Sequence, residues 1–126
     1  MGTERHWKCD DPVHRAAYAA ITSEALGCLD GKWKILILCQ LFALGTLRFS
    51  ELERSVEGIT QKMLVQQLRE LEKDGIVART AFPQVPPRVE YSLTDVGRAL
   101  GPPMTALIDW AEMRRNSQAA GAALAR

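Results

Sequence analysis

The sequence predicts a mainly α-helical fold with a small β-hairpin, and three observations support this fold class. Residues 59–75 place apolar side chains on one side of a helix and polar side chains on the opposite side. Residues 76–82 and 88–93 are rich in strand-forming residues and enclose a loop with three prolines, as in a hairpin. With 47% hydrophobic residues among 126, the chain can form one domain with a real core.

The charge balance limits how the chain can bind nucleic acid. The net charge is +1 and the isoelectric point is near 7.7, which argues against binding through a strongly basic surface. Residues 46–93 hold seven basic and seven acidic residues. Any affinity for DNA must therefore come from sorting charges onto one face, and a dimer would double the phosphate contacts of a nearly neutral protomer.

Composition also indicates the compartment and the absence of cofactors. No apolar run approaches the ~20 residues of a membrane span, so we expect no membrane partner. Residues 1–11 are polar and mixed in charge, unlike a secretory signal, and we expect a cytoplasmic protein. The three cysteines, an odd number without a CxxC motif, argue against a disulfide framework or a structural zinc site. We expect no metal and no cofactor.

The first part of the chain predicts two helices. Asp11-Pro12 is a helix start, with an N-cap acid followed by proline at the first helical position, and this helix runs to about Leu26. Residues 33–44 are apolar on nearly every side, which is typical of the buried central helix of a small domain. Gly45 ends this second helix.

The middle of the chain predicts a helix-turn-helix. Residues 46–49 can form a short strand, and Ser50 and Glu53 have the spacing of a capping box that opens a short helix. Gly58 lies in the following turn, and Thr60 caps a longer helix.

A hairpin that directly follows a helix-turn-helix is a wing, so we expect a winged helix-turn-helix. Thr94-Asp95 caps a final helix, which Pro102-Pro103 must break or kink because proline lacks an N–H. The expected organisation is a flexible N-terminus at residues 1–11, the winged domain with its dimerisation helices at 12–115, and a frayed tail at 116–126.

The longer helix, here called the reading helix, carries a polar stripe opposite its apolar side. The stripe contains no acid and consists of Lys62, Gln66, Arg69 and Lys73. Lysine and arginine pair with phosphates or guanine edges, and glutamine can read adenine. The stripe therefore indicates a helix that enters the major groove of DNA. The alternative is an ordinary solvated helix face.

A series of short motifs runs through the chain in a specific order. It comprises Gly31-Lys32-Trp33, Arg48-Phe49-Ser50-Glu51-Leu52, Gly58-Ile59-Thr60-Gln61-Lys62-Met63-Leu64, Leu68-Arg69-Glu70-Leu71-Glu72-Lys73-Asp74-Gly75, Pro86-Pro87-Arg88-Val89-Glu90-Tyr91-Ser92-Leu93-Thr94 and Trp110. In these motifs the chain resembles the HxlR-type winged-helix transcriptional regulators, relatives of the MarR type, from Pro12 to Trp110. The resemblance implies a bacterial or archaeal regulator whose first and last helices form a dimer. It also implies that each protomer's reading helix enters one of two successive major grooves.

The predicted DNA-binding residues form three groups. The anchors at the DNA backbone are Arg48, Ser50, Thr60 and Lys62. The residues facing base edges are Gln61, Lys62, Val65 and Gln66, and Arg69 meets phosphate farther along the helix. In the wing, Gln84 and Arg88 reach the minor groove or the backbone. The alternatives are helix capping for Ser50 and Thr60, partial burial for Val65, and a local ion pair for Arg88.

The terminal helices carry more apolar surface than a small winged domain needs. The predicted dimer interface is Ala17, Ile21, Leu107, Ile108 and Trp110. An aromatic-lined pocket between the reading domain and these helices can hold a small-molecule effector.

The cysteines raise a question about redox control. Many HxlR-type proteins carry a cysteine immediately before the proline that opens the first helix, and in some it senses oxidants. Here Asp11 occupies that place and Cys9 lies two residues earlier, so Cys9 is the candidate redox sensor. Cys28 and Cys39 lie in apolar surroundings, where a thiol is usually buried and inert.

The leading hypothesis is a non-enzymatic, sequence-specific transcriptional regulator that binds double-stranded DNA as a homodimer on an inverted-repeat operator. Control by a small effector or by a redox signal stays open. The alternative is a winged helix that serves only as a protein-interaction module, which the neutral net charge favours. An enzyme is not indicated, because the sequence has no glycine-rich phosphate loop, metal triad or plausible catalytic set.

Overall fold

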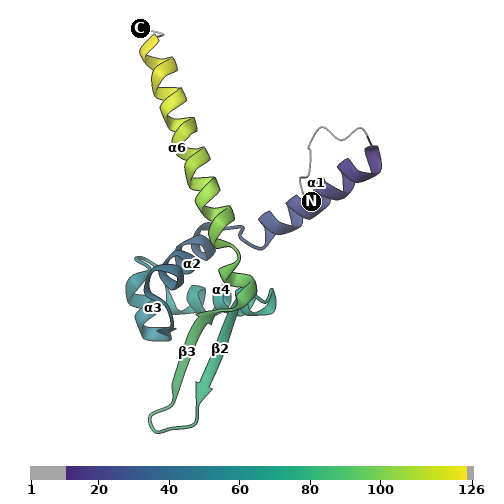
Figure 1. Cartoon of the computed structure of the whole chain (residues 1–126). Coiled ribbons are helices and arrows are strands. Elements are labelled where there is room, and N and C mark those ends of the chain that lie inside the picture. The colour runs from purple at the N-terminus through teal and green to yellow at the C-terminus, as the bar shows by residue number, and fades with distance from the viewer. Residues whose placement is uncertain (1–10, 125–126) are drawn as a thin grey trace.

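A computed structural model describes residues 11–124, and these form the predicted mainly helical fold with a small antiparallel sheet. The elements in chain order are α1 (Pro12–Gly27), α2 (Lys32–Leu44), β1 (Leu47–Arg48), α3 (Phe49–Ser55), α4 (Gln61–Lys73), β2 (Val77–Phe82), β3 (Arg88–Leu93), α5 (Asp95–Arg98) and α6 (Gly101–Leu124). The reading helix is α4. Its apolar side lies in the core, and the wing extends away from α1 and α6 (Figure 1).

The sheet has three strands in the order β1-β3-β2, all antiparallel. The wing is the β2–β3 hairpin, whose register runs from Val77 opposite Leu93 to Phe82 opposite Arg88. The short strand expected at residues 46–49 is confirmed as β1, which pairs Leu47 with Tyr91. Because β1 leads directly into α3, the sheet ties the wing to the helix-turn-helix.

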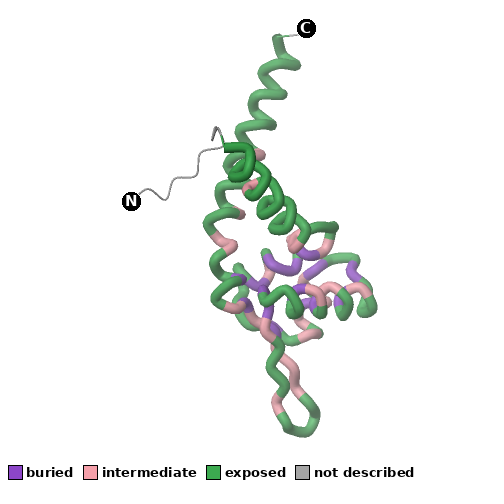
Figure 2. Tube along the Cα trace, turned by 90° about the vertical axis from the view of Figure 1, so that its right-hand side faces the viewer, coloured by how far each residue is buried: buried purple, intermediate pink, exposed green. Residues whose placement is uncertain are grey.

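The core lies between α2, α3, α4 and the base of the wing, where the buried segments gather (Figure 2). The expected apolar side of the reading helix is confirmed, since Leu64, Leu68 and Leu71 are almost fully buried. The expectation for α2 is only partly met. Its inner side is buried, whereas Leu36 and Leu44 on the outside are 41% and 59% exposed. A helix that is apolar all round therefore has an uncovered face in a single protomer.

The cap of α3 differs from the predicted capping box. The Glu51 carboxylate accepts a hydrogen bond at 2.8 Å from the backbone N–H of Arg48, which is the N-cap residue. Ser50 already lies inside the helix and does not cap it. The reason is the sheet: β1 ends at Arg48, so the helix begins directly at Phe49.

The C-terminal helix also differs from expectation. Pro102 and Pro103 lie in the first turn of α6, where helical N–H groups have no intrahelical partner, so they do not break it. The chain bends earlier, between α5 and α6. Helix α6 continues to Leu124, whereas fraying was expected from residue 116.

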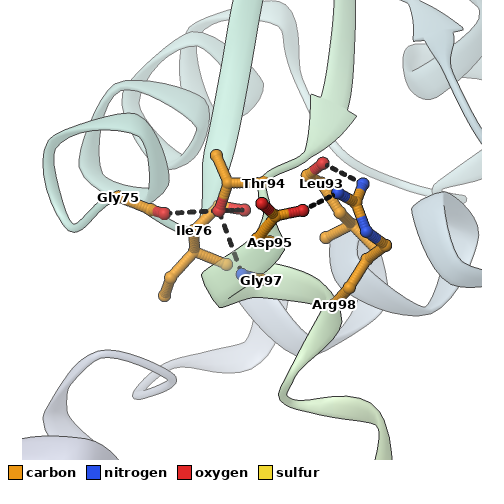
Figure 3. Close-up of polar contacts among 7 residues, drawn as sticks. All are labelled: Gly75, Ile76, Leu93, Thr94, Asp95, Gly97 and Arg98. Carbon is orange, nitrogen blue, oxygen red and sulfur yellow. Dashed lines mark hydrogen bonds and ion pairs between the residues drawn. The ribbon is translucent and has the colours of Figure 1, made fainter.

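A polar junction holds the base of the wing against the end of α4 (Figure 3). The Thr94 hydroxyl donates to the carbonyl of Gly75 at 2.6 Å and accepts from the backbone N–H of Gly97 at 3.0 Å. At Gly97, a Cβ atom would lie 2.2 Å from the carbonyl oxygen of Ile76. Only glycine permits this approach, which sets where the chain leaves the sheet toward α6.

Candidate nucleic-acid interface

The outer face of α4 forms a shallow groove. Its lining includes five of the residues predicted to contact DNA, namely Gln61, Lys62, Val65, Gln66 and Arg69. Their exposure follows from the helix period, because the buried leucines occupy the opposite side. Val65 is 36% exposed, so it is partly buried and still accessible to a base methyl group.

Two local features determine where α4 begins. Gly58 has a φ of +86°, a conformation that allows the tight turn before the helix. The Thr60 hydroxyl accepts from the backbone N–H of Met63 at 3.1 Å. Thr60 therefore caps the helix, as one of the two interpretations of this residue expected, and its side chain is exposed.

A second groove runs between α3 and the wing. It is lined by four further predicted residues, Arg48, Ser50, Gln84 and Arg88, together with prolines of the wing loop. Phe49 lines both grooves, so the two surfaces meet at its half-buried ring. This role was not predicted, because Phe49 is a single aromatic residue next to a short strand.

The wing arginine is held by its neighbours. Arg88 donates a hydrogen bond from Nε to the Glu90 carboxylate at 2.7 Å, and its guanidinium lies 4.9 Å from the centre of the Phe82 ring. The local ion pair considered for Arg88 is therefore present. It fixes the guanidinium at the edge of the wing and offsets part of its charge.

A third groove lies between α4 and the wing. Arg69 reaches it from the helix and Arg79 from β2, with Glu72 beside them. Arg79 was not among the residues predicted to contact DNA. Its basic side chain extends the surface from the reading helix onto the hairpin.

An ion pair behind the reading helix was also missed. Lys34 of α2 has a side chain only 8% exposed, and its Nζ lies 2.6 Å from Oε1 of Glu70. The hydrogen bond from Lys34 and its positive charge lower the pKa of the Glu70 carboxyl below the ordinary value of 4.5. Lys34 was overlooked because it lies within the most apolar run of the chain.

The predicted dimer residues lie far from these grooves, on the two helices that project from the body (Figure 1). None of residues 12–27 or 101–124 is buried. The large side chains among the predicted residues, Ile21, Leu107, Ile108 and Trp110, are each 54–57% exposed, and Ala17 is exposed as well.

An apolar groove of about 560 Å³ lies between the end of α1, α2 and α6. Its walls include Leu26, Ile35, Leu107 and Ile108. Cys39 also lines this groove and is exposed, so the expectation that it is buried is wrong for the protomer. Its position on the outer face of α2 is the reason.

Cys28 is half-buried beside the core, and Cys9 lies outside the residues that the structure describes. Across residues 11–124, every helix is too short or too polar to cross a membrane.

Comparison with known proteins decides the family. Residues 28–119 match the profile of the HxlR-like helix-turn-helix family. The chain belongs to the HxlR family. It is 46% identical over 101 residues to an uncharacterised HTH-type transcriptional regulator of Methanothermobacter thermautotrophicus, covering 80% of this chain and 76% of that protein. It is 50% identical over 90 residues to the HTH-type regulator YkvN of Bacillus subtilis, covering 71% and 73%.

Solved structures of similar proteins support the HxlR assignment. The redox regulator HypR in its reduced form is 43% identical, with a TM-score of 0.71 and coverage of 79% of this chain and 98% of HypR. The reduced form of the regulator YodB from B. subtilis is 32% identical, with a TM-score of 0.61 and coverage of 82% and 93%. The resemblance inferred from the motifs is confirmed. This HxlR-family chain is a helix-turn-helix transcriptional regulator, and its family consists of regulators, not enzymes.

Proposed function

We propose that this regulator binds a specific inverted-repeat operator as a homodimer, with α4 in the major groove and the wing beside it. The observation that carries the proposal is the continuity of the grooves around Phe49. Nine of the ten predicted DNA-binding residues line them, from Gln61 on α4 to Arg88 on the wing.

Charge pairing supports the same proposal. Of the acids near these grooves, Glu70 is paired with Lys34 and Glu90 with Arg88, while Glu72 lies beside Arg69 and Arg79 without an ion pair among the described residues. Lys62, Arg69 and Arg79 line the grooves without an ion pair among the described residues. A nearly neutral chain therefore presents its unpaired cations where DNA phosphates would lie.

Dimerisation is supported by the exposed apolar surface of α1 and α6 and by the groove that they form with α2. Burying such surface against a second copy would remove it from water. Because these helices and the wing lie at opposite ends, the dimer contact leaves both reading surfaces free.

The experiment selects duplexes from a randomised DNA pool and measures the affinity for the selected and a scrambled duplex across a salt series. We expect an inverted repeat with half-site centres one helical turn apart, ~34–36 Å. Binding to the scrambled duplex should be weaker and should fall steeply with salt. Equal affinity for both duplexes would reject the proposal in favour of the protein-interaction module, which the net charge of +1 favours.

Control by a redox signal or small effector is part of this proposal. The support is the similarity to proteins named as redox regulators, together with the thiols of Cys9 and the exposed Cys39. Oxidation should lower the affinity of the wild type for the selected duplex, and Cys9→Ser should abolish that response. A response that persists in Cys9→Ser and disappears in Cys39→Ser would identify Cys39, in the apolar groove, as the sensor. An affinity unchanged by oxidation would leave only effector control.

A further inference from the structure

An ion pair connects the core of the protein to the groove on the outer face of α4. Lys34 projects from α2, its side chain is 8% exposed, and its ammonium group lies 2.6 Å from Oε1 of Glu70 on α4. A buried ammonium requires a charged partner, because an unpaired buried charge is strongly unfavourable. Lys34 therefore holds one side of the Glu70 carboxylate against the body of the domain.

The other carboxylate oxygen contacts a residue of the groove on the outer face of α4. Its partner is the side-chain amide of Gln66, one helical turn earlier, whose Nε2 lies 3.4 Å from Oε2 of Glu70. Glu70 and Gln66 both line the groove on the outer face of α4. Lys34, Glu70 and Gln66 thus form a continuous chain of contacts that runs from the core to the surface.

This arrangement restricts a side chain that is otherwise free to rotate. When one amide hydrogen of Gln66 points to Glu70, the side chain offers its carbonyl oxygen and its second amide hydrogen to a ligand. Those two groups match the donor and acceptor edge of adenine in the major groove. A contact that favours this orientation before binding also reduces the conformational entropy that is lost on binding.

The same arrangement explains how an acid can face DNA. A carboxylate in this groove would repel phosphates, and an unpartnered one would attract the amino group of cytosine. Lys34 supplies the opposite charge from behind the helix, where it cannot itself reach DNA. The acid can then serve as a hydrogen-bond acceptor for Gln66 with much of its repulsion removed.

We propose that Glu70 and Lys34 are positioning residues for base recognition, with Glu70 orienting Gln66 and Lys34 acting as the buried counter-ion of Glu70. The proposal rests on the proposed function, because Gln66 must face a base for its orientation to matter.

The first test is a double-mutant cycle on base preference. Affinities are measured for the selected operator and for operators with each half-site base pair changed, using wild type, Glu70→Gln, Gln66→Ala and the double variant. Glu70→Gln should reduce discrimination at one position by roughly 5- to 10-fold, within the range for a single base contact. The double variant should match Gln66→Ala at that position. Additive losses would overturn the proposal, because Glu70 would then act independently of Gln66.

The second test addresses the counter-ion. Lys34→Met keeps an unbranched side chain that is one atom shorter, but it leaves Glu70 unneutralised, so affinity for all duplexes should fall, most strongly at low salt. Adding Glu70→Gln to Lys34→Met should restore the overall affinity without restoring the base preference. If affinity stays low in the combined variant, Lys34 acts by supporting the fold alone. Thermal unfolding of each variant shows which ones are folded.

Asp74→Asn is the matched control. It removes an exposed acid at the end of the same helix, and Asp74 lines none of the three grooves. It should leave the base preference unchanged. A change equal to that of Glu70→Gln would show a general effect of helix charge and overturn the specific role.

A third measurement needs no DNA, so it separates this proposal from the proposed function. In nuclear magnetic resonance spectra of the free protein, the side-chain amide signals of Gln66 should shift in Glu70→Gln, while those of Gln84 in the wing loop should not. Unmoved Gln66 signals would overturn the positioning role. If no duplex is bound selectively by the wild type, the proposed function fails, even when the Gln66 signals shift.

Discussion

Gln66 and Arg88 lie in different grooves and contact different partners. These surroundings determine what each side chain is expected to contribute to DNA binding. Gln66 is exposed on the reading helix with a long contact to Glu70, whereas Arg88 is held firmly by Glu90 and the Phe82 ring. A side chain that presents both a donor and an acceptor can distinguish bases, while a fixed guanidinium near phosphates acts mainly as a charge.

Substituting these two residues should therefore have different effects. Gln66→Ala should weaken operator binding by about 1–3 kcal/mol and leave binding to random DNA nearly unchanged. Arg88→Ala should weaken both alike and reduce the salt slope by at most about one. The measurement is a titration of both duplexes at several salt concentrations, and equal effects of the two substitutions on operator and random DNA would refute the assigned roles.

The Lys34–Glu70 pair also makes stability depend on pH. The hydrogen bond and charge of Lys34, with smaller contributions from Gln66 and Lys73, lower the pKa of Glu70 in the folded protein. A lowered folded-state pKa stabilises the protein fully above the ordinary value of 4.5, and this stabilisation is lost as the pH falls through the lowered pKa. The melting temperature of wild type should thus exceed that of Glu70→Gln at neutral pH and converge with it in acid. A difference that does not change with pH would contradict the linkage.

Among the elements, α4 and the wing are joined through the junction at Thr94 and Gly97. The Thr94 hydroxyl contacts the turn after α4 and caps α5, so one side chain connects three segments. The close approach at Gly97 leaves no room for a larger residue.

Gly97→Ala should therefore be severely destabilising, because the added Cβ would clash with backbone and not with a movable side chain. Gly27→Ala is the matched control, since a Cβ there meets nothing within 4 Å. Chemical denaturation of both variants checks the prediction. A Gly97→Ala protein as stable as Gly27→Ala would show that the junction can adjust.

At the scale of the whole molecule, the surface proposed to bind DNA and the surface proposed to form the dimer lie on different parts of the protein. The grooves around Phe49 are lined by residues of α3, α4 and the wing. The exposed apolar side chains belong to α1 and α6, which project from the other end of the body (Figure 1). The body between them contains the buried residues (Figure 2).

A single charge in the apolar surface should separate the protomers. Ile108 is 57% exposed and lines the apolar groove, so Ile108→Glu should give monomers that keep their fold and lose specific DNA binding. Light scattering at micromolar concentration and circular dichroism test this. A wild type that is already monomeric under these conditions would refute the dimer.

Cysteine labelling gives a second measurement of the same assembly. Cys39 lines the apolar groove, and a partner protomer seated there should protect it from alkylation. Labelling of Cys39 should accelerate in Ile108→Glu, with the half-buried Cys28 as the internal comparison. Equal labelling rates in wild type and variant would place the partner's contact elsewhere on α1 and α6.

The features that could be predicted from the sequence are those that follow from the periodicity of side chains along one helix or strand. On α4, the spacing of Leu64, Leu68 and Leu71 determined both the buried side and the side that carries Gln66. The wing followed from two strand-forming segments around prolines. Features that depend on tertiary contacts were not predictable. Lys34 gave no signal because its partner Glu70 is 36 residues away, and Cys39 lies in a run whose apolar residues do not show which side is uncovered.

The distance between the grooves and the projecting helices has an evolutionary consequence. A substitution on the outer face of α4 can change the preferred DNA sequence without touching the surface of α1 or α6, because the residues of the core lie between the two. After gene duplication, one copy could acquire a new set of target genes while retaining its assembly, and another could change its assembly while retaining its targets. The architecture thus allows the two properties to diverge under separate selection.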